Sequence, residues 1–225
     1  TARQDRRLST VTAQVRLTQQ VSRWQLRSGA DVQVFPVRES FSMAITDPQF
    51  NPPGAQGFND ALRPHDLTRG GTPFVFDAAR TGTAASVFTQ AVGAFGPISL
   101  NAGLRVDDYR FLVRGWQVQP RLGLSWRLPR REVVLRASYN RNYQTPPNEN
   151  LLLSSADAAA RLTPASVRDA LGGVRAIRPE RQDVVEAGLQ VALGGAFTFD
   201  VAAYAKRSRD QQDNNNFFDT GIIFP

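Results

Sequence analysis

The sequence predicts an all-β protein, a segment of an antiparallel, up-and-down transmembrane β-barrel. Three observations predict this class: polar and apolar residues alternate over long runs, no apolar stretch suffices for a spanning helix, and short and long connections alternate. Hydrophobic residues make up 41% of the 225 residues, and the mean hydropathy is −0.33. A spanning helix needs roughly 18 consecutive apolar residues, whereas half of each barrel strand is polar. The composition therefore speaks against a transmembrane helix and permits a barrel.

The first hairpin shows the alternation most clearly. In residues 11–20, Val11, Ala13, Val15 and Leu17 share one face, and polar side chains occupy the other. After a break at residues 21–23, the same pattern continues through residues 24–34. Successive side chains of a strand point to opposite faces, and a tilted spanning strand needs about 9 to 11 residues. Both runs reach that length, so they predict two membrane-spanning strands.

The later part of the chain repeats this pattern. A third, less regular strand is predicted over residues 87–95, and clean alternation predicts strands at 98–107, 116–126, 133–140, 185–191 and 197–206. The total is about eight strands. We expect their apolar residues to face lipid, among them Val11, Val15, Leu17, Leu104, Leu122 and Leu135.

The connections indicate how the strands are oriented. Those at 21–23, 96–97, 129–131 and 194–196 are tight, whereas those at 38–83, 108–115 and 141–181 are longer. Outer-membrane barrels combine short periplasmic turns with long extracellular loops, so the long connections are expected to face outward. Within the last one, Thr163-Pro164 followed by Gly172-Gly173 predicts a short helix.

Two sets of residues are candidates for function. The polar face carries charged side chains that are expected to form a structural network in the lumen: Arg105, Asp107, Arg121, Arg136 and Glu186. The outer loops offer aromatic and hydrogen-bonding side chains that are expected to contact a solute first: Phe41, Phe50, Arg141, Asn142, Tyr143 and Gln144.

Other functional classes find little support. The chain has no Cys and one His, and no G-x-S-x-G motif is present, so neither an enzyme nor a metal or cofactor site is predicted. The formal net charge is +7, but the basic residues are not gathered into a stripe, which argues against nucleic-acid binding. The start, TARQDRRL, has no signal-peptide pattern, so we expect a fragment or a mature piece.

Four motifs together resemble a known family. NAGLRVDDY at 101–109, QPRLGLSW at 119–126, ASYNRNYQTPP at 137–147 and RPERQDVVEAG at 178–188 are similar, in this order, to consecutive barrel strands of TonB-dependent outer-membrane receptors. The likeness is close over residues 83–208, although Val106 stands where the family often has Tyr.

This resemblance implies a 22-stranded barrel in a Gram-negative outer membrane, with an N-terminal plug and energy supplied by an inner-membrane TonB complex. It implies import of a scarce solute such as a metal chelate, cobalamin or saccharide, and residues 1–225 would be one part of the barrel domain. Two alternatives stay open at this point: a self-contained small outer-membrane barrel acting as pore or adhesin, and a soluble lipocalin-like binding protein, whose apolar face would point inward.

Overall fold

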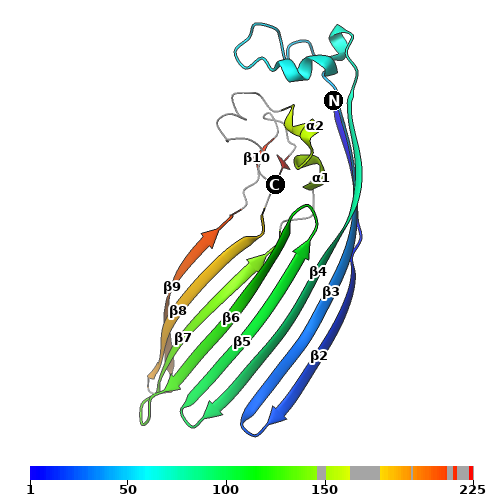
Figure 1. Cartoon of the computed structure of the whole chain (residues 1–225). Coiled ribbons are helices and arrows are strands. Elements are labelled where there is room, and N and C mark those ends of the chain that lie inside the picture. The colour runs from blue at the N-terminus through cyan, green and yellow to red at the C-terminus, as the bar shows by residue number, and fades with distance from the viewer. Residues whose placement is uncertain (146–150, 163–177, 194, 212–214, 217–222, 225) are drawn as a thin grey trace.

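The computed structural model describes residues 1–145, 151–162, 178–193, 195–211, 215–216 and 223–224. Most of them form one nine-stranded antiparallel sheet (Figure 1). Its path runs β1-β3-β4-β5-β6-β7-β8-β9, with β2 also paired to β3. The large-sheet strands are β1 (Ala2–Leu8), β2 (Val11–Val21), β3 (Trp24–Met43), β4 (Phe74–Phe95), β5 (Ile98–Arg110), β6 (Arg114–Arg127), β7 (Val133–Gln144), β8 (Glu180–Leu193) and β9 (Phe197–Arg209).

Small elements accompany this sheet. No helix among the described residues is long and apolar enough to cross a membrane. The predicted helix between Thr163 and Gly173 lies outside the described residues. The small elements are the 3-10 helices η1 (Asp60–His65) and η2 (Leu67–Arg69), the helices α1 (Leu151–Ser154) and α2 (Asp157–Ala160), and the strand pair β10 (Asn215–Asn216) and β11 (Ile223–Phe224).

The strands β1 and β2 form one line along the edge of β3. Leu8 is the register partner of Val37, and Val11 that of Val34, so the two strands keep a single register across the gap. The gap lies opposite Pro36, which has no N–H for the ladder. Counted as one line, β1 and β2 together with the seven other strands give the eight predicted from the sequence.

The four tight turns that the sequence predicted all lie at one end of the sheet. Each has a residue with positive φ: Ser22 (56°), Gly96 (59°), Arg130 (60°) and Gly195 (73°). Hairpin turns that match the twist of the strands commonly require such a conformation. Glycine adopts it without steric cost, so Gly96 and Gly195 suit their turns.

The long connections at the other end are shorter than the sequence predicted. The loop expected at 38–83 spans only residues 44–73, because β3 continues for six residues and β4 begins ten residues earlier than expected. The connection expected at 108–115 is a three-residue link, residues 111–113, and the one expected at 141–181 begins after Gln144. The boundaries on β3, β4 and β5 were wrong because the alternation of polar and apolar residues changes phase there and does not stop.

The phase change is visible on β3. Up to Val34 the apolar side chains share a face with those of β2, but beyond it Phe35, Val37 and Phe41 point to the other face and are buried. Phe35 and Val37 pack with Tyr109, Phe111 and Leu152. Beyond residue 34 the core therefore lies on the opposite side of the sheet from the apolar surface below.

The loops at this end contain short helices (Figure 1). Phe41, Ile45, Leu62, Phe74, Leu153 and Leu162 form a second buried cluster. Glu39 is 1% exposed, and its carboxylate accepts hydrogen bonds from Gln4 Nε2 (3.0 Å) and from the backbone N–H of Leu153 (3.0 Å). Residues 151–162 are thereby held against β3.

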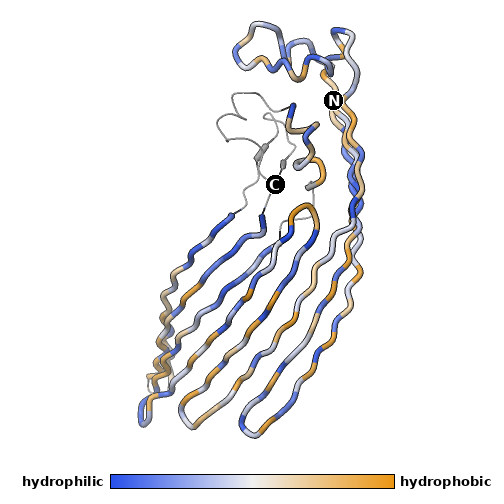
Figure 2. The backbone as a smooth tube through the Cα atoms, in the orientation of Figure 1, coloured by the Kyte–Doolittle hydropathy of each residue, from blue (hydrophilic) through white to orange (hydrophobic). Residues whose placement is uncertain are grey.

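Below these loops, the two faces of the sheet differ in chemistry. One face exposes the apolar residues predicted to meet lipid, for example Val15 (71% exposed) and Leu122 (53%). The other is polar, and residues of β4, β7 and β8 line one hollow on it, so the sheet curls toward this side. The apolar face is therefore convex and the polar face concave. Alternating orange and blue along each strand in Figure 2 shows the same division.

This arrangement contradicts the lipocalin-like alternative. A soluble barrel of that kind packs its apolar side chains inside, whereas here they cover the outer, convex face.

Candidate functional site

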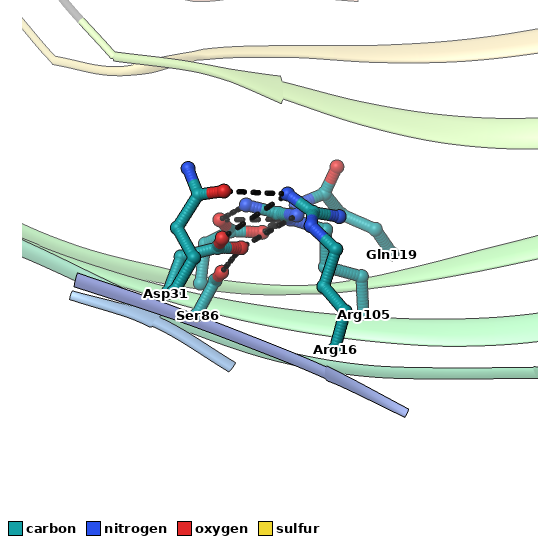
Figure 3. A network of polar contacts seen from close by, with 7 residues as sticks. Arg16, Asp31, Ser86, Arg105 and Gln119 are labelled. Atoms are coloured by element: carbon teal, nitrogen blue, oxygen red, sulfur yellow. Dashed lines mark hydrogen bonds and ion pairs between the residues drawn. The ribbon is translucent and has the colours of Figure 1, made fainter. Parts of the chain in front are cut away.

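A network of polar side chains crosses the concave face (Figure 3). It joins six consecutive lines of strand, from β2 to β7, through side-chain contacts. The register explains why it can form, because Asp31 on β3, Ser86 on β4 and Asp107 on β5 are cross-strand partners in one row. Directly opposed residues on one face lie about 4.5 to 5.5 Å apart at their Cβ atoms.

Asp31 is the acceptor on the β3 side. Its carboxylate accepts a hydrogen bond from Ser86 Oγ at 2.9 Å. It also forms ion pairs with Arg16 Nη2 at 3.4 Å and with Arg105 Nη1 at 3.6 Å. The side chain of Asp31 is 12% exposed, so these contacts replace most of the water that a free carboxylate would hold.

Arg105 continues the network toward β6. Its Nε and Nη2 atoms donate to Asp107 at 2.9 to 3.0 Å, and the same carboxylate accepts from Gln119 Nε2. Gln119 Oε1 in turn accepts the backbone N–H of Tyr143 at 3.1 Å. Forked arginine contacts of this kind fix geometry as well as charge.

The contact with Tyr143 marks a change in how β6 and β7 pair. Their backbone ladder ends at Arg121 and Asn140. Beyond it, the buried side chains of Gln119 and Gln117 bridge to the β7 backbone, and Gln117 Nε2 donates to the carbonyl of Asn142 at 3.2 Å. Side chains thus satisfy backbone groups that the ladder no longer pairs, and the outer end of β7 is held over the concave face.

The outer end of β7 closes a hollow of about 560 Å³ on the loop side of the network. Known pockets for small molecules span about 300 to 1,000 Å³. Carboxylate, guanidinium, amide and hydroxyl groups line much of this one, so it suits a polar solute. Its lining consists of Asp31, Gln33, Ala84, Ala85, Ser86, Arg105, Asp107, Asn142, Tyr143, Gln144, Thr145 and Gln182.

An aromatic cluster lies next along these strands toward the loops. The rings of Phe35 and Tyr109 stack with centroids 6.0 Å apart, and Phe111 meets Phe35 edge-on at 5.5 Å. Leu152 of α1 packs on this cluster, with Tyr143 at its border. The aromatic cluster therefore lies between the hollow and the loops.

The structure separates the residues predicted for the lumen network. Arg105 and Asp107 are joined as described above. Arg136 instead reaches Asp200 on β9, with Nη1 to Oδ2 at 2.8 Å. Arg121 and Glu186 form no hydrogen bond or ion pair with another described residue, so their place in a lumen network stays a prediction. The polar face is wider than a single set of contacts can cover.

Arg136 can reach Asp200 because Gly188 lies between them. A Cβ atom at Gly188 would come within 2.8 Å of Arg136 Nε. Glycine at this position of β8 therefore leaves a path for the guanidinium across the strand.

The predicted solute contacts are also divided. Phe41 is 2% exposed inside the second cluster, so its prediction as a surface contact was wrong; the phase change at residue 34 turns it inward. Phe50 is exposed in the loop at residues 44–73. The four residues from Arg141 to Gln144 belong to β7 and not to the loop, and Arg141 Nε donates to Asp183 at 2.7 Å. Asn142, Tyr143 and Gln144 line the hollow.

Sequence reasoning missed several members of the site. Arg16 and Asp31 were identified only as polar-face residues of the first hairpin. Their position on that face was the one signal that could have pointed to the network. Ser86 and Gln119 gave no signal, because a hydroxyl or an amide on a polar face is ordinary. Among the described residues, no group of three or more His, Cys, Asp or Glu side chains could hold a metal ion.

The sheet is curled and antiparallel, with an apolar convex face, a polar concave face, turns at one end and loops at the other. These features define the wall of an outer-membrane-type barrel. The family model described as "TonB dependent receptor-like, beta-barrel" matches residues 2–222. The chain therefore belongs to the TonB-dependent receptor family, as the four sequence motifs indicated.

Solved structures agree on the fold. The chain is similar to the copper transporter OprC (TM-score 0.58, 16% identity, 93% of this chain and 30% of that one). It is also similar to the FrpB iron transporter from Neisseria meningitidis (0.56, 16%, 89% and 29%) and to the ferric yersiniabactin uptake receptor FyuA from Yersinia pestis (0.58, 10%, 94% and 30%). The chain thus spans about a third of the length of these proteins. A search of curated proteins found no match.

Proposed function

We propose that this chain is part of an outer-membrane active transporter that binds a scarce solute on the loop side and imports it with energy from the TonB complex. Receptors of this family are outer-membrane proteins of Gram-negative bacteria and transport solutes; they are not enzymes. Residues 1–225 would form one part of a larger barrel domain, whose further strands and plug lie outside this stretch. The one-third coverage of the similar structures supports this division.

The observation that carries the proposal is the hollow at the loop side of the concave face. It is large enough for a small solute, and the cross-strand network fixes one of its walls. Preorganised polar groups lose little freedom on binding. Asn142, Gln144 and Gln182 supply amides, and Tyr143 supplies an aromatic face next to them.

We place first contact on the loops and final binding in the hollow. Phe50 is exposed in the loop at residues 44–73, where an aromatic ring can stack on an arriving solute. Arg141 does not line the hollow, and its guanidinium forms an ion pair with Asp183. Metal chelates, cobalamin and saccharides are the solute classes to test, and the similar structures include transporters titled for copper and for iron.

The test uses the full-length receptor in cells that lack their own copy. Whole-cell binding and uptake are measured for a panel of radiolabelled ferric and cupric chelates, cobalamin and oligosaccharides. We expect one class to bind, and we expect a protonophore to abolish its uptake while surface binding persists, because only transport needs energy. Binding of no class, or uptake that is insensitive to the protonophore, would refute the proposal.

A pair of variants then locates the site. Asn142→Ala with Gln182→Ala removes two amides that line the hollow. Thr198→Ala with Ser208→Ala removes two polar groups from β9, which does not contribute to that hollow. The first pair should weaken binding about tenfold or more, since each lost hydrogen bond is worth roughly 0.5 to 1.5 kcal/mol. The second pair should leave binding unchanged, and an equal loss in both would show that recognition lies elsewhere.

A further inference from the structure

The apolar belt of the convex face ends along a line on its loop side. Val106 and Val118 are register partners on β5 and β6, as are Val185 and Ala205 on β8 and β9. The next outward positions of the same face are nearly all charged, and Figure 2 shows the loop-side ends of β8 and β9 in blue. Besides Tyr143, which packs at the border of the aromatic cluster, these positions on β5 to β9 are, in chain order, Asp108, Arg110, Arg114, Trp116, Arg141, Arg181, Asp183, Arg207 and Arg209.

Six arginines and two aspartates therefore share this edge. Arg110 Nε pairs with Asp108 at 2.7 Å, and Arg141 Nε pairs with Asp183 at 2.7 Å, which accounts for both carboxylates. The other four arginines are exposed and form no ion pair with a described residue. We call all six the arginine band: Arg110, Arg114, Arg141, Arg181, Arg207 and Arg209.

The place of this band indicates its partner. It adjoins a surface that already requires hydrocarbon, with Trp116 (65% exposed) between the two. Indole rings favour the level of lipid headgroups. A molecule that covers both surfaces must have acyl chains for the belt and an anionic group directly above them. A guanidinium binds phosphate oxygens in a two-pronged geometry, which suits it to this task.

We propose that the arginine band binds phosphate-bearing headgroups of the lipids in the leaflet on the loop side. The surface differs from the solute hollow, which opens on the concave face. The proposal rests on the membrane placement of the barrel and not on solute import.

The experiment uses the full-length receptor, folded in vesicles of phosphatidylcholine that contain a minority of phosphatidic acid. The receptor is extracted gently, and native mass spectrometry counts the lipids of each kind that remain bound. The test variant is Arg114→Gln with Arg207→Gln and Arg209→Gln. The matched control is Arg27→Gln with Arg121→Gln and Lys206→Gln, which removes equal charge from the concave face.

We expect the wild-type receptor and the control to retain phosphatidic acid in preference to phosphatidylcholine. The test variant should lose that preference by roughly tenfold or more, because a basic residue near an anionic surface contributes about 1 kcal/mol, a factor of about five. Replacing the same three arginines by lysine should restore most of the preference. Heat-modifiable migration on a gel verifies folding, and the single variants Arg114→Gln and Arg209→Gln give the answer if the triple variant does not fold.

Three results would overturn the proposal. An unchanged lipid preference in the glutamine variants would show that the arginine band is surrounded by water and does not bind lipid headgroups. An equal loss in the control would show that net charge matters and not position. If a wash with inorganic phosphate removed the lipid far better than chloride of equal ionic strength, the band would be a site for soluble phosphate.

Discussion

Replacing Leu104 by Arg tests the assignment of the faces. Leu104 is the central residue of β5, lies on the convex face opposite Thr89 and Pro120, and is 45% exposed. From Ile98 to Leu104 a strand rises about 20 Å. With a tilt of about 40° that is roughly 15 Å above the turn-side edge, near the middle of an apolar band about 25 Å tall.

At that depth an arginine costs about 2 to 4 kcal/mol. The assay is reversible denaturant unfolding of the full-length receptor in lipid vesicles, which gives the free energy of unfolding. Ser138→Arg is the matched control. Ser138 is a concave-face residue in the middle of β7, beside Glu186, which has no ion pair with another described residue. We expect this control to cost less than about 1 kcal/mol.

Equal costs at the two positions would refute the reasoning, because they would show that the convex face does not meet lipid. A larger cost at Ser138 would reverse the two faces.

Three further predictions concern packing. Arg105→Ala should lower the free energy of unfolding by about 2 to 3 kcal/mol, because the carboxylates of Asp31 and Asp107 lose their shared partner. In a double-mutant cycle, adding Asp107→Ala to this variant should cost less than Asp107→Ala costs alone. Gly188→Ala should cost about 1 to 3 kcal/mol in denaturant unfolding, because the new methyl group displaces Arg136. Gly123→Ala should cost less, because its Cβ would meet no atom closer than 3.5 Å. Similar costs for the two variants would contradict the steric argument. Phe41→Ala should cost about 3 to 5 kcal/mol of local stability and speed the hydrogen exchange of backbone amides in residues 151–162. Unchanged exchange there would show that the second cluster does not hold residues 151–162 in place.

The sequence alone determined the strands of the apolar belt and which of their side chains lie on the convex face. When polar and apolar residues alternate for ten residues, the segment is a β-strand, because only an extended chain points successive side chains to opposite faces. Val11 to Leu17 therefore predicted a strand and its lipid face without any knowledge of neighbours. The turns at residues 96 and 195 were equally local, since glycine supplies the positive φ that they use.

Only the tertiary structure decided the loop end and the site. Beyond Val34 the pattern keeps its period but changes phase, because the convex face leaves the apolar belt while the concave face gains a core of loop residues. No local rule distinguishes this from the end of a strand, so Phe41 was placed in solvent. Which charges meet depends likewise on register across several strands: Asp31, Arg105 and Gln119 are 88 residues apart along the chain at their extremes. Their contacts arise only when β3 to β6 lie side by side, and that pairing, unlike the alternation, is a property of the whole sheet.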